Sequence, residues 1–218
     1  MALAIVQARM GSLRLPGKVL MKVKGKSLLS HLLARLEKSE LIDGIVVGTP
    51  DEIIRDDVEN HGFDCIVSDR DEDDVLGRYL DIAEEYGADT VVRITGDCPL
   101  IDAETVDQTI SVLGDYDFAT NVSPRTYPQG LDVEVMTIET LRRLDEMLEE
   151  GNAHREHVCS FLYGCEDFSI SSLVDEEDHS DLRWCVDDSD DFTRVSSILR
   201  RWGDLPYREI LRCLGGLE

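Results

Sequence analysis

Apolar residues in the first half of the chain form short runs that alternate with amphipathic stretches. The runs at 4–6, 45–47, 65–67 and 90–95 are predicted to be buried strands, because they are short, rich in β-branched residues and bounded by turn residues. Between them, apolar positions recur with helical periodicity at about 27–38, 51–59, 75–86 and 102–113. This alternation predicts an α/β fold with a mostly parallel sheet and helices on both faces.

The pattern changes after residue 114. Strands are expected at 117–121 and 131–135, separated by turns rich in proline and glycine. Helices at about 138–150 and 153–163 follow, then a strand pair near 168–174 and 182–186, and a helix from about 190 to 202. With 218 residues and no internal repeat or low-complexity linker, we expect one domain over 1–218.

The segment after the first strand contains a candidate anion-binding loop. It runs from Gln7 to Lys18 and includes Arg9, Arg14 and Gly11, with a further proline and glycine just before the lysine. Glycine permits close approach of backbone N–H groups to a ligand, and arginine and lysine match phosphate oxygens. The loop is therefore predicted to bind one anion.

The charge distribution supports this prediction. Residues 1–38 carry eight cations and one acid, whereas residues 39–218 carry 14 cations and 45 acids, in a chain of net charge −24. One basic loop in such an acidic protein is typical of a polyphosphate site. The alternative is that these cations only offset the acidic remainder. Because the three cations of the loop lie among turn residues and not on a helix face, we favour the polyphosphate site.

Composition and spacing exclude several other classes. Gly11 and Gly17 are one residue too far apart for a Walker A loop, Val19 stands where that loop has a hydroxyl, and the Rossmann G-x-G-x-x-G pattern is absent. No apolar run approaches the ~20 residues that span a bilayer, and no signal peptide is expected. The acidic pI near 4.4 argues against a nucleic-acid partner.

The six cysteines form no C-x-x-C pair, so we expect reduced packing residues in a cytoplasmic protein. Scarce lysine with abundant aspartate suggests a high-salt cytoplasm, in which self-repulsion is screened. Unfolding in dilute buffer that molar KCl reverses would support this hypothesis, and full stability in dilute buffer would count against it.

The N-terminal pattern V-Q-A-R-M-G-S-L-R-L-P-G-K resembles the signature of cytidylyltransferases that make CMP-activated acidic sugars. It is most similar to the spore coat polysaccharide biosynthesis branch, related to acylneuraminate cytidylyltransferase and CMP-Kdo synthetase. The resemblance continues in the family's order through five further blocks: Asp74–Tyr79, Arg93–Leu100, Gly130–Glu134, Arg155–Val158 and Arg183–Asp187.

This resemblance implies a Rossmann-like, three-layer nucleotidyltransferase fold with a mixed sheet. A nucleotide-binding part would occupy about 1–114, and a part for the acceptor sugar and dimerisation about 115–187. The implied reaction is Mg²⁺-dependent transfer of CMP from CTP to an acidic sugar, a nonulosonic or ulosonic acid, with release of pyrophosphate. We expect a homodimer. The alternatives are a nucleotidylyltransferase that uses another NTP and a sugar phosphate, a glycosyltransferase of similar architecture, or a non-catalytic nucleotide-binding protein.

The candidate metal site follows from the sheet. Ligands of open α/β sheets bind beyond the carboxyl ends of the strands, where loop 7–18 and Asp97 are both expected. A carboxylate beside a triphosphate is reasonable if Mg²⁺ lies between them, although Asp97 could instead cap a turn. The resemblance adds Asp187 as a second metal ligand, with Asp188 as its possible substitute; both could equally serve the start of a helix.

The remaining site residues are assigned by chemistry and resemblance together. Lys18, Arg14 and Asp97 are the candidate catalytic residues, since they would hold the triphosphate, the leaving pyrophosphate and the metal. The candidate nucleotide-binding residues are Ala8, Arg9, Gly11, Ser12, Asp74, Arg93, Thr95 and Gly96. The candidate acceptor-binding residues are Gln129, Asp132, Glu134, Arg155 and His157.

More specific expectations apply to Asp74, Arg155 and His157. Asp74 could equally be the N-cap of its helix. Arg155 is the expected partner of the sugar carboxylate. His154 and His157 form an H-x-x-H pair, but without a third ligand this pair is interpreted as polar helix surface.

Overall fold

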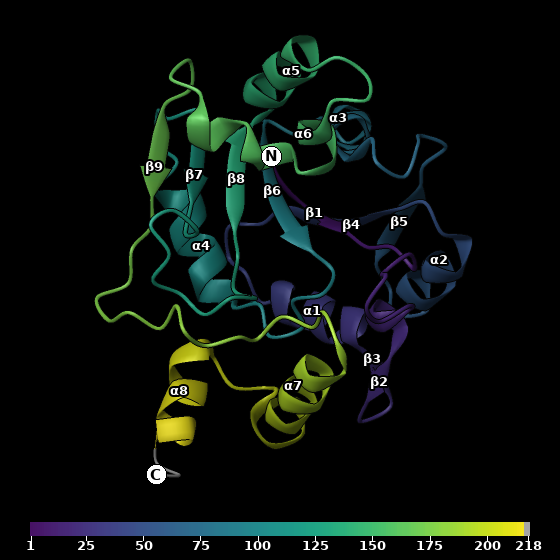
Figure 1. Ribbon diagram of the computed structural model, residues 1–218, viewed down its shortest axis with the longest axis vertical. Helices are drawn as coiled ribbons and strands as arrows, with labels where there is room; N and C mark the ends of the chain where they lie inside the picture. The colour runs from purple at the N-terminus through teal and green to yellow at the C-terminus, as the bar shows by residue number, and fades with distance from the viewer. Residues whose placement is uncertain (216–218) are drawn as a thin grey trace.

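The computed structural model describes residues 1–215, and its centre is one seven-stranded sheet of order β5-β4-β1-β6-β8-β7-β9. β1 pairs in parallel with β4 and β6, and β8 runs antiparallel to both of its neighbours. The strands are β1 (Ala2–Gln7), β4 (Gly44–Thr49), β5 (Asp64–Val67), β6 (Thr90–Thr95), β7 (Phe118–Thr120), β8 (Glu134–Thr137) and β9 (Ile170–Ser172). The predicted α/β fold with a mostly parallel mixed sheet is confirmed (Figure 1).

Helices cover both faces of this sheet (Figure 1). The helices are α1 (Leu28–Leu36), α2 (Glu52–Glu59), α3 (Val75–Glu85), α4 (Ala103–Ser111), α5 (Ile138–Met147), α6 (Ala153–Glu156), α7 (Ser189–Trp202) and α8 (Tyr207–Gly215). In the view of Figure 1, α7 and α8 lie below α1 and α4. Three 3₁₀ turns, η1 (Lys18–Leu20), η2 (Val158–Ser160) and η3 (Leu162–Gly164), and a small hairpin of β2 (Lys22–Val23) and β3 (Lys26–Ser27) complete the described elements.

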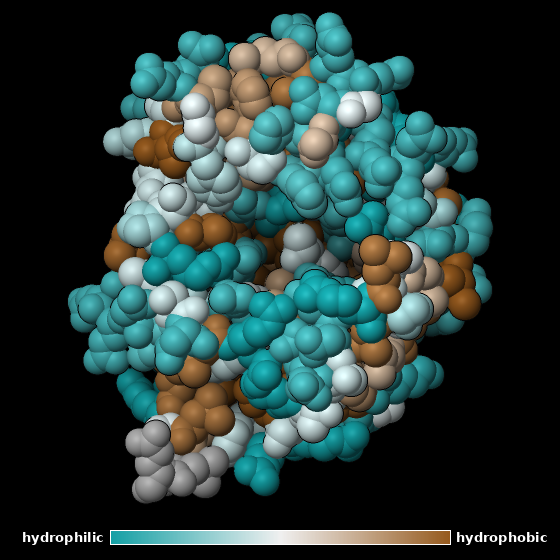
Figure 2. Space-filling model, viewed as in Figure 1, coloured by the Kyte–Doolittle hydropathy of each residue, from teal (hydrophilic) through white to brown (hydrophobic). Residues whose placement is uncertain are grey.

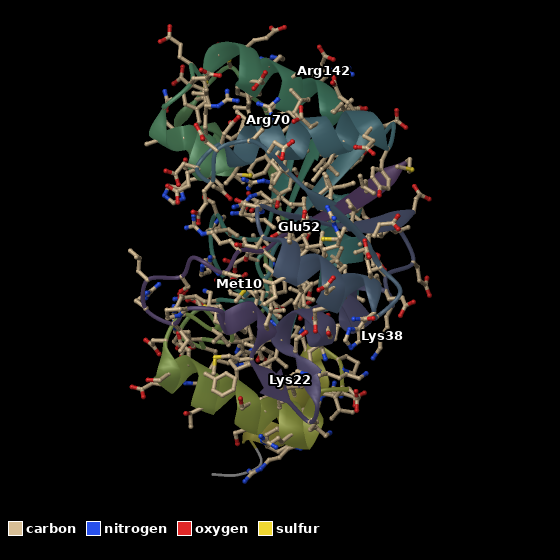
Figure 3. All side chains as sticks on the ribbon, turned by 90° about the vertical axis from the view of Figure 1, so that its right-hand side faces the viewer. Met10, Lys22, Lys38, Glu52, Arg70 and Arg142 are labelled. Atoms are coloured by element: carbon tan, nitrogen blue, oxygen red, sulfur yellow. The ribbon has the colours of Figure 1, made fainter. Side chains whose placement is uncertain are left out.

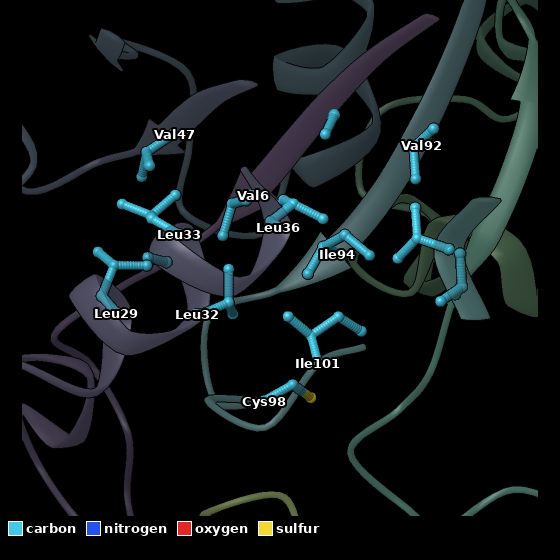
Figure 4. Packing of buried hydrophobic residues seen from close by; sticks show 14 of the residues in the cluster. Val6, Leu29, Leu32, Leu33, Leu36, Val47, Val92, Ile94, Cys98 and Ile101 are labelled. Carbon is cyan, nitrogen blue, oxygen red and sulfur yellow. The ribbon is translucent and has the colours of Figure 1, made fainter. Parts of the chain in front are cut away.

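The main core lies between the sheet and α1. Leu29, Leu32, Leu33 and Leu36 recur at helical spacing and are fully buried against strand residues such as Val6 (Figure 4). The helix begins where the Ser27 hydroxyl, at the N-cap, accepts a hydrogen bond from the Ser30 backbone N–H at 2.9 Å. A second cluster packs α3 and α5 on the opposite face, and a third packs α7 and α8 around Trp184.

The structure corrects two predicted elements. The helix expected at 153–163 ends at Glu156 and gives way to η2 and η3, and the strand expected at 182–186 forms only an isolated bridge between Arg183 and Gln129. In both segments apolar residues are buried without forming a long helix or a strand. Their hydrophobic pattern therefore predicted the wrong element. α8 and the β2–β3 hairpin were not predicted from the sequence.

Candidate active site

The carboxyl ends of β1 and β6 lie side by side, and Gly96 allows their loops to meet. Its backbone N–H donates to the Gln7 carbonyl oxygen at 2.7 Å. A Cβ atom at position 96 would lie 2.9 Å from the same oxygen, which is too close for any side chain. The glycine therefore lets the turn after β6 cross the end of β1.

The loop after β1 folds back on itself before Lys18. The Met10 carbonyl oxygen accepts hydrogen bonds from the backbone of Ser12 at 2.9 Å and of Gly17 at 3.0 Å. The Met10 N–H donates to the Asp51 carboxylate at 2.7 Å, which holds the loop beside the start of α2 (Figure 3, where Met10 and Glu52 are labelled). Gly17 has a φ of +69°, a left-handed conformation that turns the chain into η1.

Lys18 lies at the centre of the site. Its Nζ atom is 2.8 Å from Oδ2 of Asp97 and 3.0 Å from Oδ1 of Asp187. The lysine side chain is 11% exposed, and the two carboxylates are 25% and 23% exposed, so the cluster faces solvent from a half-buried position. Arg14 adds a second cation 3.1 Å from Asp187. The predicted triphosphate and metal residues thus converge on one point.

These contacts shift the pKa values of Lys18 and Asp187. Burial opposes the charge of Lys18, but Asp97 and Asp187 more than offset it and raise the pKa of Lys18 above its ordinary value. Burial likewise opposes the charge of Asp187, yet Lys18 and Arg14 hold the pKa of Asp187 below its usual range. Lys18 and Asp187 therefore carry opposite charges at neutral pH.

A cleft of about 320 Å³ opens beside this cluster. Ten of the predicted site residues line it: Ala8, Arg9, Gly11, Ser12, Arg14, Lys18, Thr95, Gly96, Asp97 and Asp187. The exposed backbone of the loop and its cations face a space of the size that small ligands require. Leu13, at the tip of the same loop, is 99% exposed.

Asp187 reaches the cluster because segment 183–186 lies against segment 129–131. The Gln129 carbonyl oxygen accepts hydrogen bonds from Trp184 at 2.6 Å and from Cys185 at 3.1 Å. Gly130, at φ +104°, passes so close that a Cβ atom would overlap the backbone of Trp184 and Cys185. Asp188 faces elsewhere, since its side chain caps α7 by accepting from the N–H groups of Asp190 and Asp191.

Arg9 is held by acids on the far wall of the loop. It pairs with Glu72 and with Glu156, each at 3.3 Å. Glu72 also approaches Gly11 so closely that a Cβ atom there would lie 2.6 Å from its Oε1 atom. Segment 70–74 therefore forms a lateral wall of the candidate nucleotide site.

Asp74 and Arg155, predicted for different ligands, contact each other. Asp74 caps α3 through the Gly77 N–H at 3.2 Å, and it pairs with Arg155 at 2.7 Å and with Arg70 at 2.7 Å. Arg155 is only 6% exposed and donates further hydrogen bonds to Asp145 and to the Leu148 carbonyl oxygen. This network joins α6 to α3 and α5, and it engages both residues in holding the fold together.

The other predicted acceptor residues contact arginines on the β6–β8 side. Glu134 forms a cross-strand ion pair with Arg93 and accepts a hydrogen bond from the Tyr163 hydroxyl at 2.7 Å. Asp132 pairs with Arg125 through both of its oxygens.

The last two predicted acceptor-binding residues are Gln129 and His157. The side-chain oxygen of Gln129 accepts from Arg183 at 2.6 Å. Arg183 also pairs with Asp187 at 2.5 Å, so it links Gln129 to the central cluster. His157 is exposed at the end of α6.

Three residues of this neighbourhood were not assigned roles from the sequence. Arg183 stood in the quoted Arg183–Asp187 block, so its position was available as a signal. No sequence signal pointed to Arg125 or Tyr163, because Arg125 lies in an irregular segment and Tyr163 in η3, and long-range contacts bring both to the neighbourhood of β8.

The donor set at Lys18 fits a hard divalent cation bound together with a nucleotide. Among residues 1–215 no cluster of three or more His, Cys, Asp or Glu side chains is placed to hold a metal ion. Two carboxylates do converge, at Asp97 and Asp187, and Mg²⁺ typically takes one or two carboxylates with water and phosphate oxygens as its other ligands. A nucleotide would therefore complete the ligand set.

Comparison with known proteins relates the chain to nucleotidyl transfer. A family model described as Cytidylyltransferase matches residues 3–164. The solved structure of a cytidylyltransferase from Leptospira borgpetersenii serovar Hardjo-bovis superposes with a TM-score of 0.91, at 30% identity, over 99% of this chain and 94% of that one.

Two curated relatives are similar in sequence. The spore coat polysaccharide biosynthesis protein SpsF of Bacillus subtilis is 27% identical over 220 residues, covering 94% of this chain and 88% of that protein. A 3-deoxy-manno-octulosonate cytidylyltransferase of Pelobacter propionicus is 35% identical over 112 residues, or 51% of this chain. That match spans 44% of the Pelobacter protein, less than half of its length. Within residues 1–215, no helix is long and apolar enough to cross a membrane.

Proposed function

The chain belongs to the cytidylyltransferase family, and from this premise we propose that it transfers CMP from CTP to an acidic sugar, a nonulosonic or ulosonic acid, and releases pyrophosphate. The product would supply surface polysaccharide or glycoconjugate synthesis. Two similar proteins carry names that fit this proposal: a 3-deoxy-manno-octulosonate cytidylyltransferase and a spore coat polysaccharide biosynthesis protein.

One observation carries the proposal: the Lys18 ammonium contacts Asp97 and Asp187 at the mouth of the cleft that loop 8–17 lines. A site that only bound a nucleotide would gain nothing from two carboxylates next to its phosphate-binding cations, because like charges repel. The pair becomes useful when charge must be balanced at a phosphorus atom during reaction.

Loop 8–17, with Arg14 and Lys18, would bind the triphosphate and orient it for the reaction. Backbone N–H groups of loop 8–17 and the side chains of Arg14 and Lys18 would bind the triphosphate. In an in-line displacement the attacking sugar hydroxyl and the leaving pyrophosphate lie on opposite sides of the α-phosphorus. Lys18 and Arg14 would stabilise the negative charge that grows on the pyrophosphate, and the fixed loop would hold the phosphorus in line with the hydroxyl.

Asp97 and Asp187 would hold Mg²⁺, which when bound supplies positive charge at the α-phosphate and lowers the pKa of the attacking hydroxyl. Lys18 is free to move to the phosphates once the carboxylates have another cation.

The test is pyrophosphate release with Mg²⁺, each of the four NTPs and a panel of acidic sugars. Release with CTP and one acidic sugar is the expected result. Release with another NTP and a sugar phosphate would instead indicate the related sugar-phosphate nucleotidylyltransferases. Tight CTP binding by calorimetry without release on any acceptor would indicate a nucleotide-binding protein.

A further inference from the structure

An acidic sugar carries a carboxylate that needs a cationic partner in its binding site. Most of the arginines near the cleft are already engaged. Arg155 is 6% exposed and is shared between two carboxylates and a carbonyl oxygen on the α3–α5 side. Arg93 is paired with Glu134 in the sheet, and Arg183 is divided among Asp187, Asp191 and Gln129.

Arg125 differs from these arginines in its contacts. Its two terminal nitrogens donate to the two oxygens of one carboxylate, at 2.6 Å and 2.9 Å, and that carboxylate is the side chain of Asp132. Among the residues that the structure describes, Asp132 is the one hydrogen-bond partner of this guanidinium. Both side chains keep partial access to solvent, 25% for the arginine and 36% for the aspartate.

The geometry of this pair is that of guanidinium–carboxylate recognition. Two parallel N–H···O bonds bind a carboxylate with high directional specificity. The partner here is a short side chain of the same chain, with a third of its surface exposed, so an incoming carboxylate can replace it without opening the core. A partly exposed ion pair of this kind contributes little to stability. Replacing the Asp132 carboxylate by that of a ligand therefore costs little folding free energy.

The position of Arg125 also fits an acceptor site. Asp132 lies two residues before Glu134, the first residue of β8, and Glu134 itself contacts Arg93 and the Tyr163 hydroxyl. The hydrogen bond to Asp132 raises the pKa of Arg125, and smaller coulombic contributions come from Cys185, two residues before Asp187, and from Tyr163. The surface is hollowed at the centre of the face on which β6 and β8 are visible (Figure 2).

We propose that Arg125 is the receptor for the carboxylate of the acceptor sugar, and that the carboxylate of Asp132 occupies its place in the free protein. This inference rests on the proposed function, and it gives Arg125 the role that sequence reasoning had given to Arg155. Arg125 thereby determines that the acceptor is an acid, while Asp97, Asp187 and Lys18 serve the nucleotide.

The test compares an acidic sugar with its analogue in which the carboxylate is reduced to a primary alcohol. The measured quantity is the ratio of kcat/KM for the acid to kcat/KM for the alcohol, from pyrophosphate release with CTP. In the wild-type protein the acid is strongly preferred. Arg125→Met lowers this ratio by about 100-fold, because a bidentate charged contact is lost only with the acid.

Calorimetry of CTP binding and the melting temperature accompany each variant. Arg125→Met is expected to bind CTP like the wild type, which separates a damaged site from a lost carboxylate receptor. Arg142→Met, which removes an exposed arginine paired with Glu84, is the matched control and leaves the ratio unchanged.

Four outcomes overturn the inference. A wild-type preference for neutral acceptors would overturn the acidic-sugar function itself, and the role of Arg125 with it. A wild-type preference for acids that persists in Arg125→Met would leave the function standing and remove Arg125 from recognition. Equal losses for acid and alcohol in Arg125→Met would assign that side chain a purely structural role, and loss of the preference in Arg155→Met would restore the sequence-based assignment.

Discussion

The backbone N–H of Val186 donates a hydrogen bond to the carbonyl oxygen of Asp97, with 2.9 Å between nitrogen and oxygen. This bond joins the turn after β6 to a segment that lies far along the chain, just before α7. The next residue, Asp187, therefore starts from backbone that touches Asp97, and both carboxylates reach the ammonium of Lys18. Together with the hydrogen bonds from Trp184 and Cys185 to Gln129, this backbone contact brings Asp187 to the candidate catalytic cluster.

Asp187 and Asp188 are neighbours with different expected roles. Asp187→Ala removes a carboxylate from Lys18 and from the candidate metal site, so pyrophosphate release is expected to fall roughly 100-fold or more. Asp188→Ala removes the N-cap of α7 and is expected to cost about 1 kcal/mol of folding free energy while turnover persists. Pyrophosphate release and thermal unfolding of the two variants measure this contrast. Equal turnover in both would contradict the assignment of Asp187.

Lys18 is expected to compete with a divalent cation in the free protein. Lys18→Met removes the positive charge between Asp97 and Asp187, so Mn²⁺ should bind the nucleotide-free variant about tenfold more tightly than it binds the wild type. Calorimetric titration with Mn²⁺ in the absence of CTP measures this. Lys22→Met, which alters an exposed lysine of β2, serves as control. Unchanged Mn²⁺ affinity in Lys18→Met would show that the ammonium does not occupy the metal position.

Arg155 is expected to contribute stability that depends on pH. Burial favours the protonated form of Asp74, but hydrogen bonds from Arg155, Arg70 and the Gly77 N–H hold the pKa of Asp74 below its ordinary value of 3.8. A lowered pKa in the folded state stabilises the fold above pH 3.8, and this contribution is lost as the pH falls through the folded-state pKa. Arg155→Met is therefore expected to cost about 3 kcal/mol at pH 7.

Urea unfolding of wild type and Arg155→Met across pH 2–7 measures this difference. The two stability curves should converge as the pH falls through the lowered folded-state pKa of Asp74, because the carboxylate is then neutral in both proteins. A difference that stays constant down to pH 2 would mean that the arginine acts through packing and not through its charge.

Gly130 is expected to be essential to the cluster. Gly130→Ala places a Cβ atom into the backbone of Trp184 and Cys185 and imposes a left-handed conformation on alanine, so it should cost about 3 kcal/mol and reduce turnover. Gly151→Ala is the matched control. Gly151 also has a positive φ, +80°, but nothing lies within 4 Å of the added atom, so only a backbone cost of about 1 kcal/mol applies. Similar melting temperatures for the two variants would contradict the close approach.

Much of the architecture followed from local pattern. Short runs of three to six residues placed β1, β4, β5 and β6, and the i, i+4 spacing of leucines placed α1. The Ser27 and Asp74 caps were predictable because a hydroxyl or carboxylate before an apolar period satisfies free N–H groups at a helix start. The basic loop after β1 was visible because its cations stand among turn residues in an acidic chain.

Local pattern did not determine which side chains meet. Local pattern does not distinguish Asp187 from Asp188, and the contact of segment 183–186 with Gln129 and Asp97 directs one to Lys18 and the other to α7. In the same way, Arg155 contacts Asp74 because α6 packs on α3, and Arg125 reaches Asp132 from an irregular segment. Periodicity fixes which face of an element is buried, and so the sequence alone determined the first four strands of the sheet, the helices between them and the position of the basic loop. Pairings between charges depend on how distant segments pack, so the partners of Asp187, Arg155 and Arg125 were decided only by the tertiary structure.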